Sequence, residues 1–270
     1  MGITRKEMKQ TAKNGIRSAR PRPAWVTLVY VLLTTGLSLA VPGILLVLSG
    51  GEGFFYWLEK GYSVNELMYY YMGAAGAAML LFTNILIGLF GEVLTFGYTG
   101  YTLGVARGKT TGYASLLYGF GLAGRVILLN LLIGIFTALW SMLFLIPGIV
   151  AAYSYRMAVY ILLDNPDCGV LEAIRTSKAM MKGQKANLLV FDLSFFNCLL
   201  PFIVAGAAGA LLSGYYFFPG MALIYICSAI LSLWAVPYYL TSQAVFYDTI
   251  SDSGIRSRLG DGYSGPEIRF

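Results

Sequence analysis

The chain has 270 residues, of which 57% are apolar and only 12% are charged. Soluble domains carry about 25% charged residues, so this composition, with a mean hydropathy of +0.68, excludes a soluble globular fold. The absence of histidine excludes His-based catalytic triads and His-ligated metal sites. The three cysteines are widely spaced without a C-x-x-C pair, which predicts neither a disulfide framework nor a zinc site. We expect no cofactor.

A net charge of +6 and a pI near 9.1 permit a nucleic-acid partner. In an apolar chain, however, basic residues usually set the topology and contact anionic lipid headgroups. Residues 1–23 carry most of this charge and have helical spacing at Met8, Ala12 and Ile16, which predicts a basic, lipid-facing cytoplasmic segment. We therefore expect a bilayer with anionic headgroups on the cytoplasmic side as a partner, and no nucleic acid.

Uncharged runs long enough to cross a bilayer follow this segment. A spanning helix needs about 20 apolar residues, and residues 24–248 contain enough such runs for a transmembrane bundle. The predicted fold is an all-α, polytopic membrane helix bundle with about six transmembrane helices and additional interfacial amphipathic helices. The spans are predicted at 24–48, 67–91, 126–146, 149–163, 188–212 and 221–247.

The third and fourth predicted spans form one long run that needs a turn. Pro147 and Gly148 provide it, because proline breaks a helix and glycine permits reversal. The remaining segment, 149–163, is about 22 Å long at helical rise, which is too short to cross alone. The sequence leaves two alternatives, a deep hairpin whose tip stops inside the bilayer or a discontinuous helix.

An amphipathic helix is predicted at about 166–182. Asp164, Asn165 and Pro166 suit a helix start, and Gly183 suits its stop. Its apolar residues gather on one side and its charges on the rest, as in helices that lie at the cytoplasmic interface. The two interpretations are an interfacial connector and a docking surface for a protein partner at 170–182. The segment 92–124 is also expected along the inner interface.

The positive-inside rule orients the predicted spans. With the basic N-terminal segment in the cytoplasm, the acidic loop 49–66 falls outside and the other basic loops fall inside. This predicts a multi-pass protein of the cell membrane with both termini in the cytoplasm. Residues 249–270 are polar and Gly/Ser-rich, and they predict a mobile cytoplasmic tail. A cleaved signal peptide ending near Ala40 is the less favoured alternative.

Two ionisable residues lie inside predicted spans, where an isolated charge is costly. Arg156 lies about 12 Å deep and Asp192 about 7 Å deep from the same side, at 1.5 Å per residue. Their depths and opposite signs predict an intramembrane ion pair that ties the fourth span to the fifth. A proton or substrate role, or snorkelling to the interface, remains open.

A set of short motifs resembles the bacterial domain-of-unknown-function family 975, and distantly the membrane domain of glycerophosphodiester phosphodiesterases. The resemblance covers about residues 90–248 and implies a bacterial integral membrane protein with an all-helical fold, but it supplies no catalytic residues. The motifs are Ala106-Arg107-Gly108, Leu139-Trp140, Leu145-Ile146-Pro147-Gly148-Ile149, Tyr153-Ser154-Tyr155, Asp164-Asn165-Pro166, Glu172-Ala173-Ile174, Ser177-Lys178, Met181-Lys182-Gly183, Leu193-Ser194-Phe195, Pro237-Tyr238 and Phe246-Tyr247.

Three functions fit these features. The favoured one is a non-enzymatic scaffold, partner subunit or assembly module of the cell membrane. The alternative is a transporter or permease-like component with a site near the broken third/fourth span. An intramembrane hydrolase is the third, with Glu92, Asp164 and Asp192 as its only plausible carboxylates.

Overall fold

The computed structural model describes residues 5–48, 56–57, 60, 62, 64–213 and 217–259. Within these ranges every regular element is a helix, so the predicted all-α bundle is confirmed. The chain folds into two compact units, which we describe separately. Unit 1 comprises residues 1–26, 92–197 and 235–270, and unit 2 comprises residues 27–91 and 198–234.

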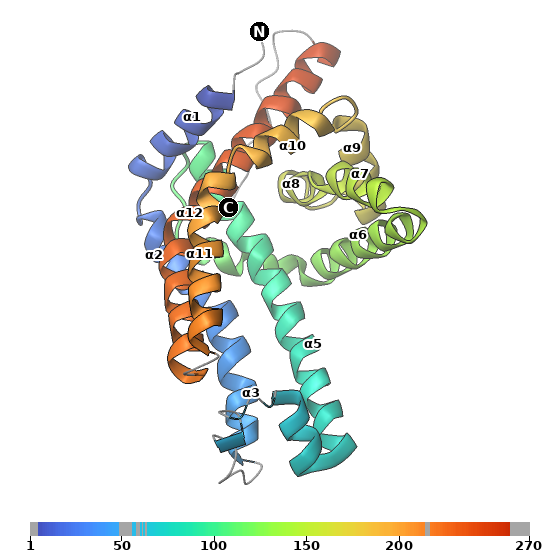
Figure 1. The fold of residues 1–270 in the computed structure, drawn as a ribbon. Helices are drawn as coiled ribbons and strands as arrows, with labels where there is room; N and C mark the ends of the chain where they lie inside the picture. The colour runs from blue at the N-terminus through green and yellow to red at the C-terminus, as the bar shows by residue number, and fades with distance from the viewer. Residues whose placement is uncertain are drawn as a thin grey trace. The chain divides into compact units, whose positions relative to one another are not determined.

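Unit 1 contains both predicted intramembrane charges. Its core is built from large side chains with little or no exposure, including Leu94, Tyr98, Tyr101, Leu162 and Phe191. Its helices, coloured by position in Figure 1, are α1 (Arg5–Ser18), the C-terminal third of α5 (Val64–Ala106), the 3-10 helix η2 (Tyr113–Leu122), α6 (Ala123–Leu143), α7 (Leu145–Tyr155), α8 (Ala158–Asp164), α9 (Val170–Met180), α10 (Lys185–Leu193) and the C-terminal part of α12 (Phe217–Leu259).

Helix α5 continues well beyond the predicted span end at residue 91. Its C-terminal third, from residue 92, is mostly buried rather than spread along an interface, and η2 packs against it. Two glycines permit this approach, because a Cβ on Gly97 would meet the Leu116 carbonyl and a Cβ on Gly119 would meet the Val93 carbonyl. The small residues of the segment 92–124 thus serve close helix packing, a role that composition alone did not distinguish from an interfacial one.

Helix α1 also packs against protein where a lipid-facing helix was expected. Met8 and Ala12 are buried. Lys9 Nζ donates a hydrogen bond to the Ser194 carbonyl at 2.8 Å and lies 4.1 Å from the centroid of the Phe195 ring. The apolar stripe of this helix is therefore used within unit 1, and one of its lysines is held by a carbonyl and an aromatic face.

Unit 2 exposes many apolar side chains, as expected of a surface that faces lipid. Large apolar side chains such as Leu81, Phe82 and Trp234 are more than 60% exposed, as helices surrounded by hydrocarbon require. Its helices are α2 (Pro23–Val31, which begins in unit 1), the π-helix η1 (Leu32–Gly36), α3 (Leu37–Leu48), the first two thirds of α5, most of α11 (Phe196–Ser213) and the N-terminal part of α12.

Five of the described helical segments are long and apolar enough to cross a membrane: Pro23–Pro42, Gly73–Ala106, Tyr113–Leu143, Leu145–Asp164 and Ile226–Ser251. The fifth predicted span, 188–212, is divided between α10 (Lys185–Leu193) and α11 (Phe196–Ser213). Tight turns at Ser194 and Phe195 interrupt the helix there, and the apolar stretch that remains is Leu200–Leu211. Helix α12 continues to Leu259, so the first part of the predicted tail is helical, while residues 260–270 lie outside the described residues.

Candidate functional site: two charge networks in unit 1

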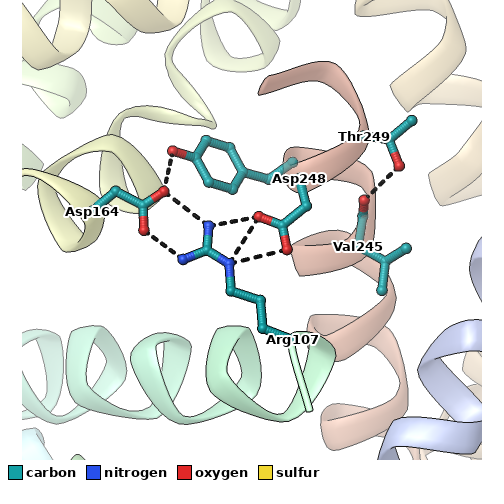
Figure 2. A network of polar contacts seen from close by, with 6 residues as sticks. Arg107, Asp164, Val245, Asp248 and Thr249 are labelled. Atoms are coloured by element: carbon teal, nitrogen blue, oxygen red, sulfur yellow. Dashed lines mark hydrogen bonds and ion pairs between the residues drawn. The ribbon is translucent and has the colours of Figure 1, made fainter. Parts of the chain in front are cut away.

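The first network joins Arg107 to two carboxylates. Arg107 follows directly after α5, Asp164 ends α8, and Asp248 lies on α12. The guanidinium lies between the two acids (Figure 2), with Nη1 2.7 Å from Asp164 Oδ1 and Nη2 2.6 Å from Asp248 Oδ1. Additional bonds run from Nη2 to Asp164 Oδ2 at 2.9 Å and from Nε to Asp248 Oδ1 at 3.0 Å. Arg107 therefore binds each carboxylate through two nitrogens, the geometry for which a guanidinium is suited.

Burial and aromatic packing reinforce this network. The Tyr247 hydroxyl donates to Asp164 Oδ2 at 2.8 Å, and the Tyr247 ring stacks on Tyr160 with centroids 5.0 Å apart. The Asp164 side chain is only 8% exposed. Burial lowers the pKa of Arg107, but its bonds to Asp164 and Asp248 outweigh this, so the pKa is raised above its usual value. The site is a permanently charged clamp on three helices.

The second network contains the predicted pair. Arg156 Nη1 lies 3.3 Å from Asp192 Oδ2, so the structure brings the two residues together. The hydroxyls of Tyr153 and Tyr239 each donate to Asp192 at 3.0 Å, and Arg156 Nη2 donates to the Tyr239 hydroxyl. The carboxylate thus has one cation and two hydroxyl partners, which offset the cost of placing it in the bundle.

Arg156 stands at an interruption between α7 and α8. The two helices are separated by Arg156 and Met157, so the span Leu145–Asp164 is discontinuous. Ser177 of α9 closes the interruption: its hydroxyl donates to the Ser154 carbonyl at 2.8 Å and accepts from the Met157 backbone N–H at 3.2 Å. Protein groups therefore satisfy backbone atoms that a broken helix leaves free.

The reversal between α6 and α7 lies earlier than predicted. Phe144 is the extended residue between them (φ −159°, ψ 150°), and Pro147 and Gly148 lie inside the first turn of α7. Proline is tolerated there because the N–H groups of a first turn have no helical partner. Gly148 permits close contact with α6, since a Cβ on it would lie 2.9 Å from Ser141 Cα. Pro147 and Gly148, the predicted turn residues, thus lie in the first turn of α7, and Gly148 lets α7 pack closely against α6.

The predicted caps of the interfacial helix are also displaced. Asp164 ends α8 and Asn165 is its C-cap, whereas α9 begins at Val170 after Gly169. Pro166 lies in the intervening turn, where its carbonyl accepts a hydrogen bond from Arg125. Gly183 has the positive φ of +82° expected of a helix stop, in the turn that follows α9. The acid suited to an N-cap is instead held by Arg107.

Helix α9 packs most of its apolar face on other helices of unit 1. Ala173, Ile174, Ser177 and Met181 are buried, and the helix contacts α6, α7 and α8. Leu171, Arg175 and Lys178 remain exposed on one side. Helix α9 is therefore part of unit 1, with its polar residues facing outward.

Sequence reasoning missed Arg107 and Asp248 as partners of Asp164. The available signal was their position: Asp248 follows directly after the uncharged run 193–247, Asp164 follows directly after the predicted span 149–163, and Arg107 ends the uncharged run 93–106. Residues that end apolar runs on the same side of a bilayer share a depth, so opposite charges there are candidates for pairing. Ser177 gave no such signal, because a serine in an amphipathic helix is ordinarily a solvated polar residue.

Each of the three carboxylates considered for hydrolysis binds a different partner. Asp164 is bound by Arg107, Asp192 by Arg156, and Glu92 accepts a hydrogen bond from Asn130 at 2.6 Å. Within the part of the chain that the structure describes, no group of three or more Cys, Asp or Glu side chains is placed to hold a metal ion. The arrangement of these acids is that of ion-pair and hydrogen-bond acceptors.

The five apolar helices indicate a multi-pass membrane protein. Residues 142–253 match a family model described as "Protein of unknown function (DUF975)". This match supports the resemblance stated above for that part of the chain, which includes α7 to α11, most of α12 and all of the second network. No curated protein and no solved structure matches the chain.

Proposed function

We propose that the protein is a non-enzymatic scaffold, partner subunit or assembly module of a bacterial cell membrane, with both termini in the cytoplasm. The observation that carries the proposal is that the charged residues of the two networks in unit 1 bind one another. Arg107, Asp164 and Asp248 form one network, and Arg156 and Asp192 form the other. Charges held in this way join helices, whereas a catalytic or transported-ion site needs a charge that is free to meet a substrate.

The proposed partner surface is the side of α9 that carries Glu172, Thr176 and Ala179, which we call its polar side. These residues are exposed, and at 100° per residue they lie on a common side of the helix. The buried side of the same helix closes the interruption between α7 and α8 through Ser177. A protein bound to the polar side would thus contact a helix that is fixed to the rest of unit 1.

In vivo photocrosslinking tests this surface. A photoreactive amino acid replaces Thr176 or Ala179 in the full chain. In the matched control the same amino acid replaces Leu81, which lies in unit 2 and is 64% exposed. We expect one recurrent protein adduct at Thr176 and Ala179 that is absent at Leu81 and that disappears when the gene for the captured protein is deleted. No adduct at either α9 position, with normal protein levels, would contradict the proposal.

The second candidate function is transport through a site near the third and fourth spans. The interruption at Arg156 and Met157 favours it, because discontinuous helices often form substrate sites in transporters. The closure of that interruption by Ser177 favours the scaffold role. Proton flux into proteoliposomes that is lost in Arg156→Gln, with fold retained, would transfer support to transport. No phosphodiesterase activity is carried over from the distant resemblance, because the chain has no histidine.

A further inference from the structure

A groove lies between the α6–α7 hairpin and the exposed side of α9. It has a volume of about 280 Å³, slightly below the ~300 Å³ at which pockets for whole small molecules begin. That size suits a length of one hydrocarbon chain. Its apolar lining consists of Phe136, Leu139, Trp140, Tyr155, Leu171 and Ile174.

Two cations complete the lining of this groove. Arg175 and Lys178, three positions apart on α9, contribute to it and therefore share one side of the helix. Both are exposed, and neither forms an ion pair with the residues that the structure describes. This distinguishes them from Arg107 and Arg156, whose charges are matched by acids. The groove therefore joins an apolar cleft to an unmatched double positive charge.

We propose that the groove binds one acyl chain of an anionic phospholipid from the surrounding bilayer, with the lipid phosphate held by Arg175 and Lys178. Charge complementarity selects this occupant, because two unmatched cations beside an aromatic and aliphatic cleft fit an amphiphile with a negative head. The position agrees: α9 begins six residues after the span that ends at Asp164, and basic pockets between membrane helices bind such headgroups. This site goes beyond the partner role, since it uses a different side of α9.

Native mass spectrometry of the full-length protein in detergent tests the site, with phosphatidylglycerol and phosphatidylcholine as probes. We expect one retained phosphatidylglycerol with clear preference over phosphatidylcholine. In Arg175→Gln/Lys178→Gln the affinity for phosphatidylglycerol should fall about 30-fold, the combined effect of two cations beside an anionic head. The matched control is Lys6→Gln/Arg17→Gln, which removes two exposed charges from α1 and should leave the affinity unchanged.

A second variant tests the apolar part of the site. Leu171 is 50% exposed, so Leu171→Trp should fold, fill the groove and weaken phosphatidylglycerol binding while both cations remain. An equal loss in the α1 control would overturn the proposal, because it would show general attraction of charge. Unchanged binding in Leu171→Trp would also overturn it, as would a protein adduct at position 175 in membranes with no retained lipid.

Discussion

Replacing Arg107 with glutamine removes the cation that two acids share. Asp164, only 8% exposed, would keep the Tyr247 hydroxyl as its remaining partner in this network. Breaking a buried ion pair by removing one member costs about 3–5 kcal/mol. Because the side chains of Arg107 and Asp248 are 20% and 27% exposed, solvent reduces the loss, and we expect Arg107→Gln to lower the free energy of unfolding by about 3 kcal/mol.

The free energy of unfolding can be measured in detergent micelles by titration with sodium dodecyl sulfate, followed through tryptophan fluorescence. Arg107→Lys keeps the charge but loses the two-nitrogen geometry, so it should cost about 1–2 kcal/mol. Adding Asp164→Asn to Arg107→Gln removes an uncompensated charge, and the double variant should be more stable than the sum of the single losses predicts, by about 1–3 kcal/mol.

Asp167→Asn is the matched control for this experiment. Asp167 also faces an arginine, but its side chain is fully exposed and lies 3.9 Å from Arg125. Exposed pairs of this kind contribute little, so the control should unfold like the parent. If Arg107→Gln were indistinguishable from Asp167→Asn, the three-helix clamp would not be a source of stability and the reasoning would be refuted.

Four further outcomes follow from the same contacts. Arg156→Ala and Asp192→Ala should each destabilise the protein, and the double variant should recover part of the lost stability. If the two losses simply add in the same titration, the ion pair does not tie the two spans together. Gly148→Ala should cost about 1–3 kcal/mol because its Cβ meets Ser141, whereas Gly134→Ala on α6, with open space around it, should not destabilise. Ser177→Ala should cost about 1–3 kcal/mol by freeing backbone groups at the α7–α8 interruption, while the exposed Thr176→Ala should be silent. Burial and Glu172 raise the pKa of the Cys168 thiol. In a Cys198→Ser/Cys227→Ser background, the alkylation rate of Cys168 should therefore rise at a higher pH than that of a free thiol, and Glu172→Gln should shift this pH profile to lower pH. Labelling should occur from the cytoplasmic side alone.

The sequence predicts most strongly where one local property decides the structure. Long uncharged runs must form helices in a bilayer because their backbone groups have no water to bind, and the all-α fold follows from that alone. The positions of Arg156 and Asp192 relative to the ends of their runs give similar depths, which is sufficient to propose a pair. The short fourth span left a deep hairpin and a discontinuous helix as alternatives, and the structure shows an interruption at Arg156 and Met157.

The remaining features depend on contacts between distant segments. Asp164 has the local chemistry of a helix cap, but Arg107, 57 positions earlier, binds it instead. The start of α9 therefore moves to Val170. Similarly, the residues 92–106 resemble an interfacial segment until Gly97 and Gly119 bring η2 against them. Such tertiary contacts override local preference, and spacing within one segment cannot reveal them.

The central claim is our proposal that the intramembrane charges hold helices together and perform no chemistry on a substrate. Its most direct test is the adduct formed at Thr176 in a chain carrying Arg156→Gln and Asp192→Asn, which removes both charges while leaving groups that can still hydrogen-bond to Tyr153 and Tyr239. We expect the folded variant to give the same protein adduct in the same yield as the parent. A variant that folds normally but loses the adduct would contradict the claim, because the charges themselves would then be needed for function.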